Sequence, residues 1–183
     1  YVRTAGMLRR NNWDDTLDDQ FDLSGDATGW GWNVSSSLNA TKSDVVRMQF
    51  TIGEGIQNEM NDSPIDIGIE NNPGNAVTPV VGQPIPIVAF NIFLDHKYND
   101  QFSSAIGYSW QDNDNTDAQA PDAFRVGHYA LGNLLYYPAP NVMFGGELQW
   151  GRRENFSDDF HSDGFKLQFS FKYNFSWKLG GQP

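Results

Sequence analysis

Hydrophobic and polar residues alternate along most of the chain, and the alternation is clearest near its C-terminal end. Between residues 164 and 175, one parity reads Phe, Leu, Phe, Phe, Tyr, Phe and the other reads Lys, Gln, Ser, Lys, Asn. A period of two residues is typical of a β-strand with one apolar and one polar face. Weaker forms of this pattern occur near 1–10, 30–40, 46–52, 85–97, 101–110, 123–137 and 142–150. The pattern predicts eight strands and no helix.

The connections between these segments alternate in length. Long polar connections fall near 11–28, 56–84, 112–122 and 156–163, and short ones near 41–44, 98–100 and 138–141. In a meander of antiparallel strands, alternate connections emerge at the same edge, so the long loops share one rim. Short periplasmic turns, long extracellular loops and strands of about ten residues are typical of outer-membrane barrels. We therefore predict an all-β, transmembrane, antiparallel up-and-down β-barrel over residues 1–175, followed by a C-terminal tail over 176–183.

A soluble sandwich or lipocalin-like barrel would also alternate, and two features favour the membrane. The polar parity consists mostly of Ser, Gly, Asn and Gln, whereas soluble surfaces carry dense Lys and Glu. Aromatic residues also gather near the strand ends, where barrels carry aromatic girdles at the bilayer interfaces. Trp30, Trp32, Trp110 and Trp150 are predicted near the long-loop rim, and Phe102, Tyr136, Tyr173 and Phe175 near the short-turn rim.

Composition excludes several other classes of protein. The chain has 183 residues, a formal net charge of −11 and no cysteine. It contains no run of roughly 18 apolar residues, as a membrane helix requires, and its mean hydropathy is −0.54. Its 23 acidic against 12 basic residues exclude a general nucleic-acid binder. The lack of cysteine excludes disulfide scaffolds and thiolate zinc sites.

Three C-terminal segments form a set: Asn-Leu-Leu-Tyr-Tyr-Pro at 133–138, Gly-Glu-Leu-Gln-Trp-Gly-Arg-Arg-Glu-Asn at 146–155, and Lys-Leu-Gln-Phe-Ser-Phe-Lys-Tyr-Asn-Phe at 166–175. Together they resemble the last strands of DcaP-type porins. The resemblance implies a 16-stranded barrel in the bacterial outer membrane, a homotrimer, and passive diffusion of small anionic solutes such as dicarboxylates. Barrels of this kind usually end on an aromatic residue, for which Phe175 and Trp177 are the two candidates.

Eight strands allow two interpretations. An eight-stranded barrel has an interior that side chains fill, but the expected inward positions include small residues such as Gly31, Ser35, Ala105 and Gly145. Such a lining packs a narrow barrel poorly and suits the wall of a wider one. We therefore expect the C-terminal half of a larger porin. The alternative is a complete, non-conducting small barrel that serves as a structural anchor, adhesin or surface-binding scaffold.

If the apolar parity faces lipid, the polar parity lines the lumen. The only acids on that parity within the strands are Asp95 and Glu147. The bases on it are Arg3, Arg9, Arg47, Arg125, Arg153, Lys166 and Lys172. A positively charged wall lowers the free energy of anion entry. The planar guanidinium of arginine can also donate two parallel hydrogen bonds to a carboxylate. The pattern predicts an anion-biased wall, although some of these bases are expected to pair with neighbouring acids.

Most of the acids lie in the long connections, where solvation is the expected role. The alternative is that they hold divalent cations and, through them, the phosphates of lipopolysaccharide. Asp112, Asp114 and Asp117 alternate as in a calcium loop but lack its glycine and distant glutamate, so they form only a weak metal candidate. No other metal and no cofactor is expected.

The connection over 56–84 is rich in Pro and Gly, and loops of this length are usually functional or disordered. It is expected either to fold inward and narrow the pore or to fold outward and latch a neighbouring subunit. The segment that follows, 85–94, is apolar on both parities apart from Asn91. A strand buried on both faces fits a trimer contact or an inserted loop.

Catalysis has little support in the sequence. His96, His128 and His161 lie on separate segments, and no Ser with a positioned His partner is evident. His128 falls on the apolar parity, where we expect an interfacial or subunit-contact role. The sequence therefore predicts a passive outer-membrane channel and no enzyme.

Overall fold

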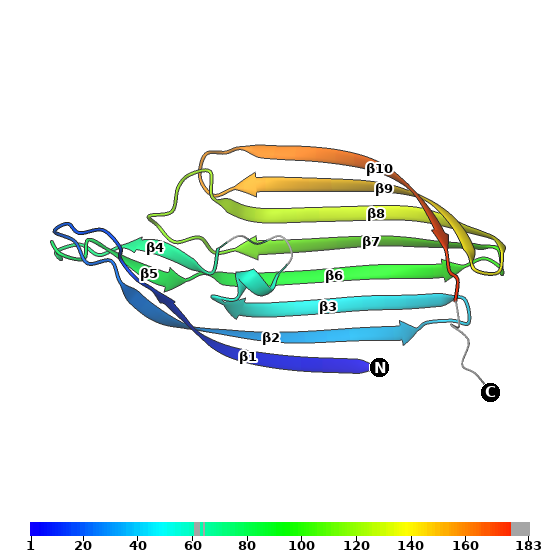
Figure 1. The fold of residues 1–183 in the computed structure, drawn as a ribbon, viewed down its shortest axis with the longest axis horizontal. Helices are drawn as coiled ribbons and strands as arrows, with labels where there is room; N and C mark the ends of the chain where they lie inside the picture. Colours follow the sequence, from blue (N-terminus) through cyan, green and yellow to red (C-terminus); the bar gives the residue numbers. More distant parts are fainter. Residues whose placement is uncertain (61–62, 64, 177–183) are drawn as a thin grey trace, which may run out of the picture.

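The computed structural model describes residues 1–60, 63 and 65–176 as one antiparallel sheet with a small hairpin beside it (Figure 1). Trp177, the rest of the 177–183 tail and Pro64 lie outside the described residues. The eight long strands, which pair in chain order, are β1 (Val2–Trp13), β2 (Gly25–Asn39), β3 (Asp44–Glu54), β6 (Pro86–Lys97), β7 (Phe102–Asn113), β8 (Phe124–Ala139), β9 (Val142–Asn155) and β10 (His161–Tyr173). The predicted all-β meander is confirmed.

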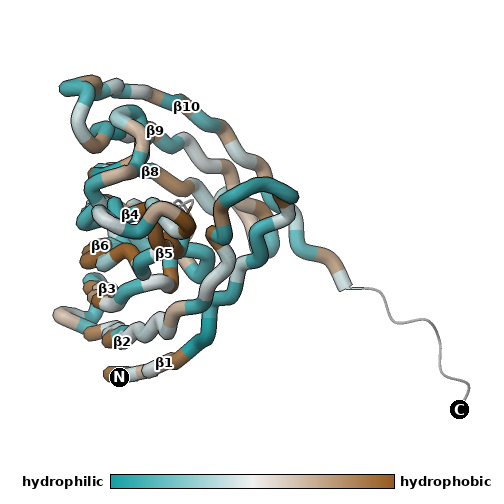
Figure 2. Tube along the Cα trace, turned by 90° about the vertical axis from the view of Figure 1, so that its left-hand side faces the viewer, coloured by the Kyte–Doolittle hydropathy of each residue, from teal (hydrophilic) through white to brown (hydrophobic). Residues whose placement is uncertain are grey.

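The sheet is curved and open. Viewed along the strands, it forms an arc with β1 and β10 at its two ends (Figure 2). These two strands are the outer members of the sheet and do not pair with each other, so the described residues form no closed barrel. The long connections emerge at one end, called here the long-loop end, and the short turns at the other, the short-turn end (Figure 1).

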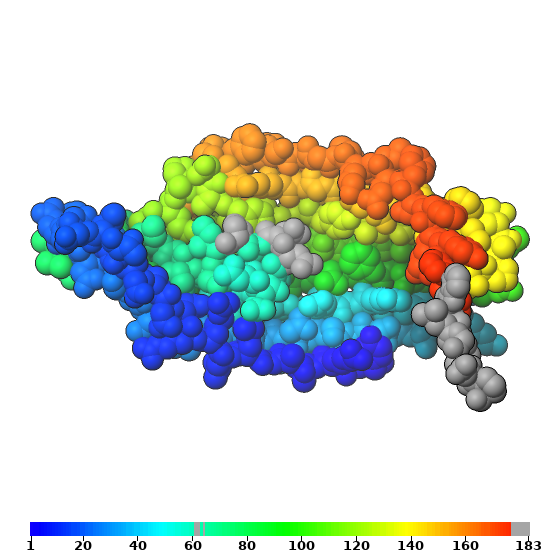
Figure 3. Space-filling model, viewed as in Figure 1, coloured from blue at the N-terminus to red at the C-terminus, as the bar shows by residue number. Residues whose placement is uncertain are grey.

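The connection between β3 and β6 contains structure that the sequence did not predict. It begins with a turn of 3-10 helix, η1 (Gln57–Glu59), and continues as a hairpin of β4 (Ile67–Asn71) and β5 (Val80–Pro84). The hairpin lies on the concave side of the arc (Figure 2). In the space-filling view, the connection lies over the long-loop end of the sheet (Figure 3). We call residues 55–85 the inserted connection.

Contacts with the inserted connection identify the concave face. A Cβ on Gly31 or Gly53 would meet the Ile56 Cδ1 atom at 2.6 or 2.8 Å, so both glycines face this segment. Because the strands pair in a continuous register, the residues that share a face with these glycines can be followed across the sheet. They include Ser35, Gln49 and Asn91 and are mostly polar. The opposite, apolar parity forms the convex face.

The convex face is apolar and open. On β10, the side chains of Phe165 and Phe169 are 75 % and 78 % exposed. On neighbouring strands, Phe50, Ile106 and Leu148 share this face and are also exposed. Soluble monomers rarely expose apolar patches of more than a few hundred Å². This apolar surface extends over all the long strands, from Leu8 on β1 to Phe171 on β10.

The buried core lies on the concave side, under the inserted connection. The buried hydrophobic residues are Ile56, Ile85, Ile87 and Ala89, and Gln57 is completely buried beside them. The Gln57 amide accepts a hydrogen bond from the Ile56 backbone N–H (2.9 Å) and donates one to the Ile85 carbonyl (2.7 Å). The connection thus folds inward, which explains why the inward parity at the start of β6 is apolar.

Gln57→Ala should release the inserted connection, because it removes both hydrogen bonds and leaves the buried Ile56 N–H without an acceptor. We expect about 1–3 kcal/mol of lost stability in this region, together with faster proteolytic cleavage between residues 55 and 85. Limited proteolysis of the full-length protein in detergent measures this. Gln83→Ala, which alters an exposed residue of the same connection, is the matched control. Equal cleavage of both variants would contradict the anchoring role of Gln57.

Candidate functional site

The concave wall contains a hollow of about 690 Å³ beside the inserted connection. Its floor is formed by small residues on β6 to β9, namely Ala89, Ser109, Gly127 and Gly151. The side chains around it are mostly polar or aromatic, among them Gln49, Glu59, Asn91, Phe124, Tyr129 and Arg153. Small residues leave space above the sheet and polar ones provide hydrogen bonds, so this surface suits contact with water and hydrophilic solutes.

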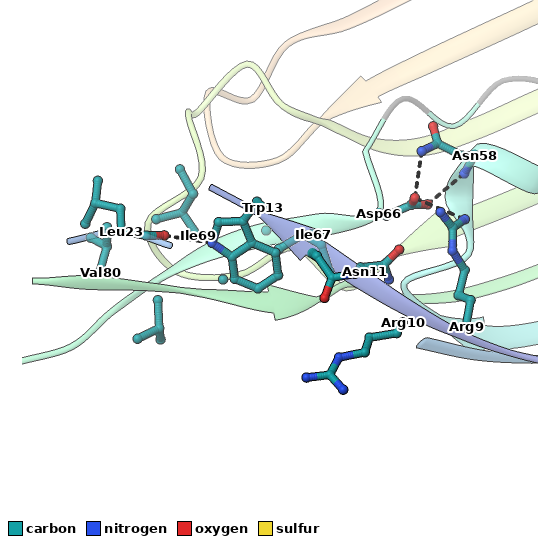
Figure 4. Close-up of a pocket in the computed structure, with 14 residues that line it drawn as sticks. Arg9, Arg10, Asn11, Trp13, Leu23, Asn58, Asp66, Ile67, Ile69 and Val80 are labelled. Atoms are coloured by element: carbon teal, nitrogen blue, oxygen red, sulfur yellow. Dashed lines mark hydrogen bonds and ion pairs between the residues drawn. The ribbon is translucent and has the colours of Figure 1, made fainter. Parts of the chain in front are cut away.

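A second hollow of about 700 Å³ lies between β1 and the β4–β5 hairpin (Figure 4). Trp13 joins its two sides. Its indole N–H donates to the Leu23 carbonyl at 2.7 Å, and its ring packs where a Cβ on Gly25 or Gly82 would stand. Trp13 therefore ties the rim of β1 and β2 to the hairpin.

Arg9, predicted to line the lumen, contacts the inserted connection. Its guanidinium lies 3.2 Å from the Asp66 carboxylate and 3.8 Å from that of Glu59 (Figure 4). Asp66 is buried and also accepts hydrogen bonds from the backbone and side-chain nitrogens of Asn58, at 2.8 and 2.6 Å. Arg9 thus fastens the inserted connection to β1, and these acids offset its charge.

Arg47 and Asp95 also offset each other. Both were predicted on the lumenal parity, and the Arg47 Nε atom lies 2.8 Å from Asp95 Oδ2 across β3 and β6. The pair adds polarity to the concave wall near the short-turn end but contributes little net charge.

Arg125 does not lie on the concave wall, where the sequence parity predicted it. The register of β8 against β9 pairs Phe124 with Asn155 and Val126 with Glu154, which leaves Arg125 as the extra residue of a β-bulge. Its Nε atom lies 3.8 Å from Asp112 Oδ1, and Asp112 has the parity of the convex face. The bulge therefore places Arg125 against Asp112 instead of on the wall beside Arg153.

The other predicted wall residues retain their concave positions. The Arg3 guanidinium lies 4.7 Å from the centre of the Tyr1 ring. The side chains of Lys166 and Lys172 make no hydrogen bond or ion pair with the described part of the chain. Glu147 accepts hydrogen bonds from Asn133 (3.1 Å) and from the Gln149 amide.

Arg153 is held by two neutral oxygens. Its Nη2 donates to the Asp122 carbonyl at 2.7 Å and its Nε to Asn155 Oδ1 at 2.9 Å. The guanidinium carbon lies 5.7 Å from the centre of the Phe124 ring. These contacts fix the orientation of the guanidinium but do not neutralise its charge.

The predicted aromatic residues lie toward the two ends of the convex face. At the long-loop end, the Trp32 indole donates to Thr4 Oγ1 (2.7 Å) and that of Trp150 to Asp163 Oδ1 (2.9 Å). Trp30 and Trp110 share their parity. At the short-turn end, the Phe102 and Tyr136 rings stack with centres 4.9 Å apart, and those of Tyr173 and Phe175 with centres 6.2 Å apart.

A polar network on the convex face was not predicted. His128 lies on that face as expected, and its Nδ1 atom is 2.6 Å from the Tyr108 hydroxyl. Its Nε2 atom is 3.9 Å from Glu154, which also pairs with Arg152 at 2.8 Å. These four residues share one parity, but their proximity depends on the pairing register, which the sequence alone does not reveal.

The acids proposed as a weak metal candidate are not brought together. Asp112 faces Arg125, whereas Asp117 accepts a hydrogen bond from the Asn71 backbone N–H at 2.9 Å. The described residues contain no group of three His, Asp or Glu side chains placed to hold a metal ion. The histidines lie on β6, β8 and β10. Among the described residues, no helix has the length and apolar character needed to cross a membrane.

Comparison with known proteins agrees with the fold. No family model and no curated protein sequence matches the chain. Among solved structures, the outer membrane channel DcaP of Acinetobacter baumannii matches with a TM-score of 0.71 and 20% sequence identity. The match covers 95% of this chain and 47% of that one, so the chain spans about half the length of DcaP. The resemblance to DcaP-type porins predicted from the C-terminal segments is thus confirmed at the level of the fold.

Proposed function

We propose that this chain forms part of the wall of a passive diffusion channel in the bacterial outer membrane. The observation that carries the proposal is the two-faced sheet, with its exposed apolar convex face and its polar concave face of small residues. In a bilayer the first face contacts lipid and the second contacts water. The fold likeness to DcaP, an outer membrane channel, supports this assignment.

The open edges of the sheet support a wide pore. Unpaired backbone groups are costly in hydrocarbon, so a membrane sheet must close on itself. Because β1 and β10 do not pair with each other, closure requires further strands, and the half-length match to DcaP makes a barrel of about twice this size the natural solution. Assembly as a homotrimer, with lipid and lipopolysaccharide around it, is part of the same proposal.

The inserted connection narrows this pore at the long-loop end. Hydrogen bonds of Gln57 and the ion pair between Arg9 and Asp66 hold it against the concave wall. Solutes would pass between it and the opposite wall, along the hollow over β6 to β9.

The unpaired charges favour anions. Arg9 and Arg47 are offset by carboxylates, and Arg125 faces Asp112. On the concave wall, Arg3, Arg153, Lys166 and Lys172 then remain without an ion pair among the described residues, against Glu147 and the second of the two carboxylates beside Arg9. A wall of this sign concentrates anions, and small carboxylates and dicarboxylates are the proposed solutes.

The full-length protein, reconstituted into planar lipid bilayers, should give discrete conductance steps with anion preference in a salt gradient. Open, water-filled passage along a polar wall is the physical reason. Insertion without conductance would instead support the non-conducting scaffold. Protease protection of the protein in vesicles of the same lipid verifies the insertion.

Replacing Arg3, Lys166 and Lys172 together by Gln should lower the anion-to-cation permeability ratio by roughly threefold, since these bases set the sign of the wall. Reversal potentials in a salt gradient measure the ratio. Arg10→Gln, Arg125→Gln and Arg152→Gln together are the matched control, because Arg10 pairs with Asp26, Arg125 with Asp112 and Arg152 with Glu154. If the control shifts the reversal potential as much as the wall variant does, the assignment of the concave face to the lumen fails.

A further inference from the structure

The concave face of β8 differs from the rest of the wall. On β7 and β9 the concave residues are small or polar, such as Ser103, Ala105 and Ser109 on β7 and Gly145 and Gln149 on β9. On β8 they are mostly apolar or aromatic. We call these residues, together with one residue of β6, the apolar lane: Phe93, Phe124, Tyr129, Leu131, Leu135 and Tyr137.

The short-turn half of the lane is open. A strand that is apolar on both faces is normally buried on both, and the convex face of β8 is also apolar, with Ala130 and Leu134. On the concave side, however, Leu131 and Leu135 are only half-buried and Tyr137 is 36% exposed. The inserted connection lies over the long-loop end of the sheet (Figure 3). This part of the lane is therefore apolar surface that a solute on the concave side can reach.

Glycines on the neighbouring strands allow the lane side chains to lie flat on the sheet. The Phe93 ring occupies the space over Gly107. Leu135 lies over Gly145, where a Cβ would be 2.8 Å from Leu135 Cδ2. Because each residue of a strand advances the chain by about 3.4 Å, the segment 129–135 extends about 20 Å along the strand direction. The lane is thus a long, low surface along the expected path of solutes.

Groups that both donate and accept hydrogen bonds border the lane. On its β7 side, Ser109 pairs with Tyr129, and Asn91 follows Ser109 one strand further. On its β9 side, Gln149 pairs with Leu131. Amides and hydroxyls suit a solute that offers both donors and acceptors, whereas a carboxylate offers acceptors alone.

A charge of each sign lies beside the lane. At the long-loop end, the Arg153 guanidinium lies 5.7 Å from the centre of the Phe124 ring. Further along β8, Asn133 interrupts the lane and donates to the Glu147 carboxylate at 3.1 Å. An anion on the lane would be repelled by Glu147 and a cation by Arg153, but the hydroxyls of a neutral solute can bond to both groups.

We propose that the apolar lane binds neutral pyranosides, the six-membered cyclic form of sugars, as they move along the wall. A pyranoside with equatorial hydroxyls presents C–H groups on both ring faces and hydroxyls at its edge. A face packs on the aromatic and aliphatic side chains, and the edge bonds to the bordering amides and hydroxyls. The proposal rests on the proposed channel function and adds a second class of solute to it. The bases that favour anions, Arg3, Lys166 and Lys172, lie apart from the lane on β1 and β10.

Saturation-transfer NMR of methyl β-D-glucopyranoside tests the proposal, with the full-length protein in micelles of a detergent that has no sugar headgroup. The wild type should bind the glucoside, and the strongest transfer should reach the axial ring protons, which belong to its faces. Erythritol, a neutral polyol without a ring face, should show no transfer.

Variants of the lane should weaken this binding. Leu131→Asn should weaken it about fivefold because a polar side chain replaces apolar contact surface. Leu131→Met should bind as the wild type does, which shows that the loss does not arise from misfolding. Glu147→Gln should weaken binding about threefold, since a neutral acceptor replaces a charged one. Ser35→Ala, on the concave face of β2 away from the lane, is the control and should leave binding unchanged.

Two results would overturn the lane: no binding of the glucoside to the wild type, or unchanged affinity in Leu131→Asn. Succinate that displaces the glucoside and itself binds more weakly to Leu131→Asn would overturn the assignment to neutral solutes. Because binding in micelles does not require conduction, Leu131-dependent binding by a protein silent in bilayers would refute the channel and leave the lane intact. Conduction without glucoside binding would do the reverse.

Discussion

Backbone hydrogen bonding across a continuous register is the constraint on which the rest of this structure depends. From β1 to β10 each strand is bonded to the next along most of its length. In hydrocarbon, where no water replaces a missing bond, such a ladder is one of the few arrangements that a chain tolerates. Once the ladder is fixed, the two-residue period assigns every strand side chain to the convex or to the concave face.

The continuous register explains why the fold could be predicted from the sequence and why parts of the candidate site could not. The strict alternation of β10, with Phe169 and Phe171 on one parity and Lys172 on the other, can be read from one sequence because the two faces of the strand differ in polarity along its whole length. The β4–β5 hairpin escaped prediction because strands of five residues are too short to show a period. Arg125 was misplaced because one extra residue reverses the parity within a strand.

The charge of the wall is the property least accessible from sequence. Arg9 and Arg47 carry the same formal charge as Arg153, but their partners Asp66 and Asp95 come from distant parts of the chain. Only the folded structure separates the bases that fasten the inserted connection or pair across strands from those that keep their charge. On the concave side, the acids of the inserted connection that bind Arg9 therefore also offset its positive charge.

The bulge in β8 makes the lining of the wall depend on strand length as well as on residue identity. With the extra residue present, Phe124 lies beneath Arg153 while Arg125 meets Asp112. Deletion of Arg125 would remove the bulge, keep Phe124 opposite Asn155 and Val126 opposite Glu154, and take away the base that faces Asp112. A single-codon deletion at this place would thus leave the Asp112 carboxylate without its base while the residues that line the concave face stay the same.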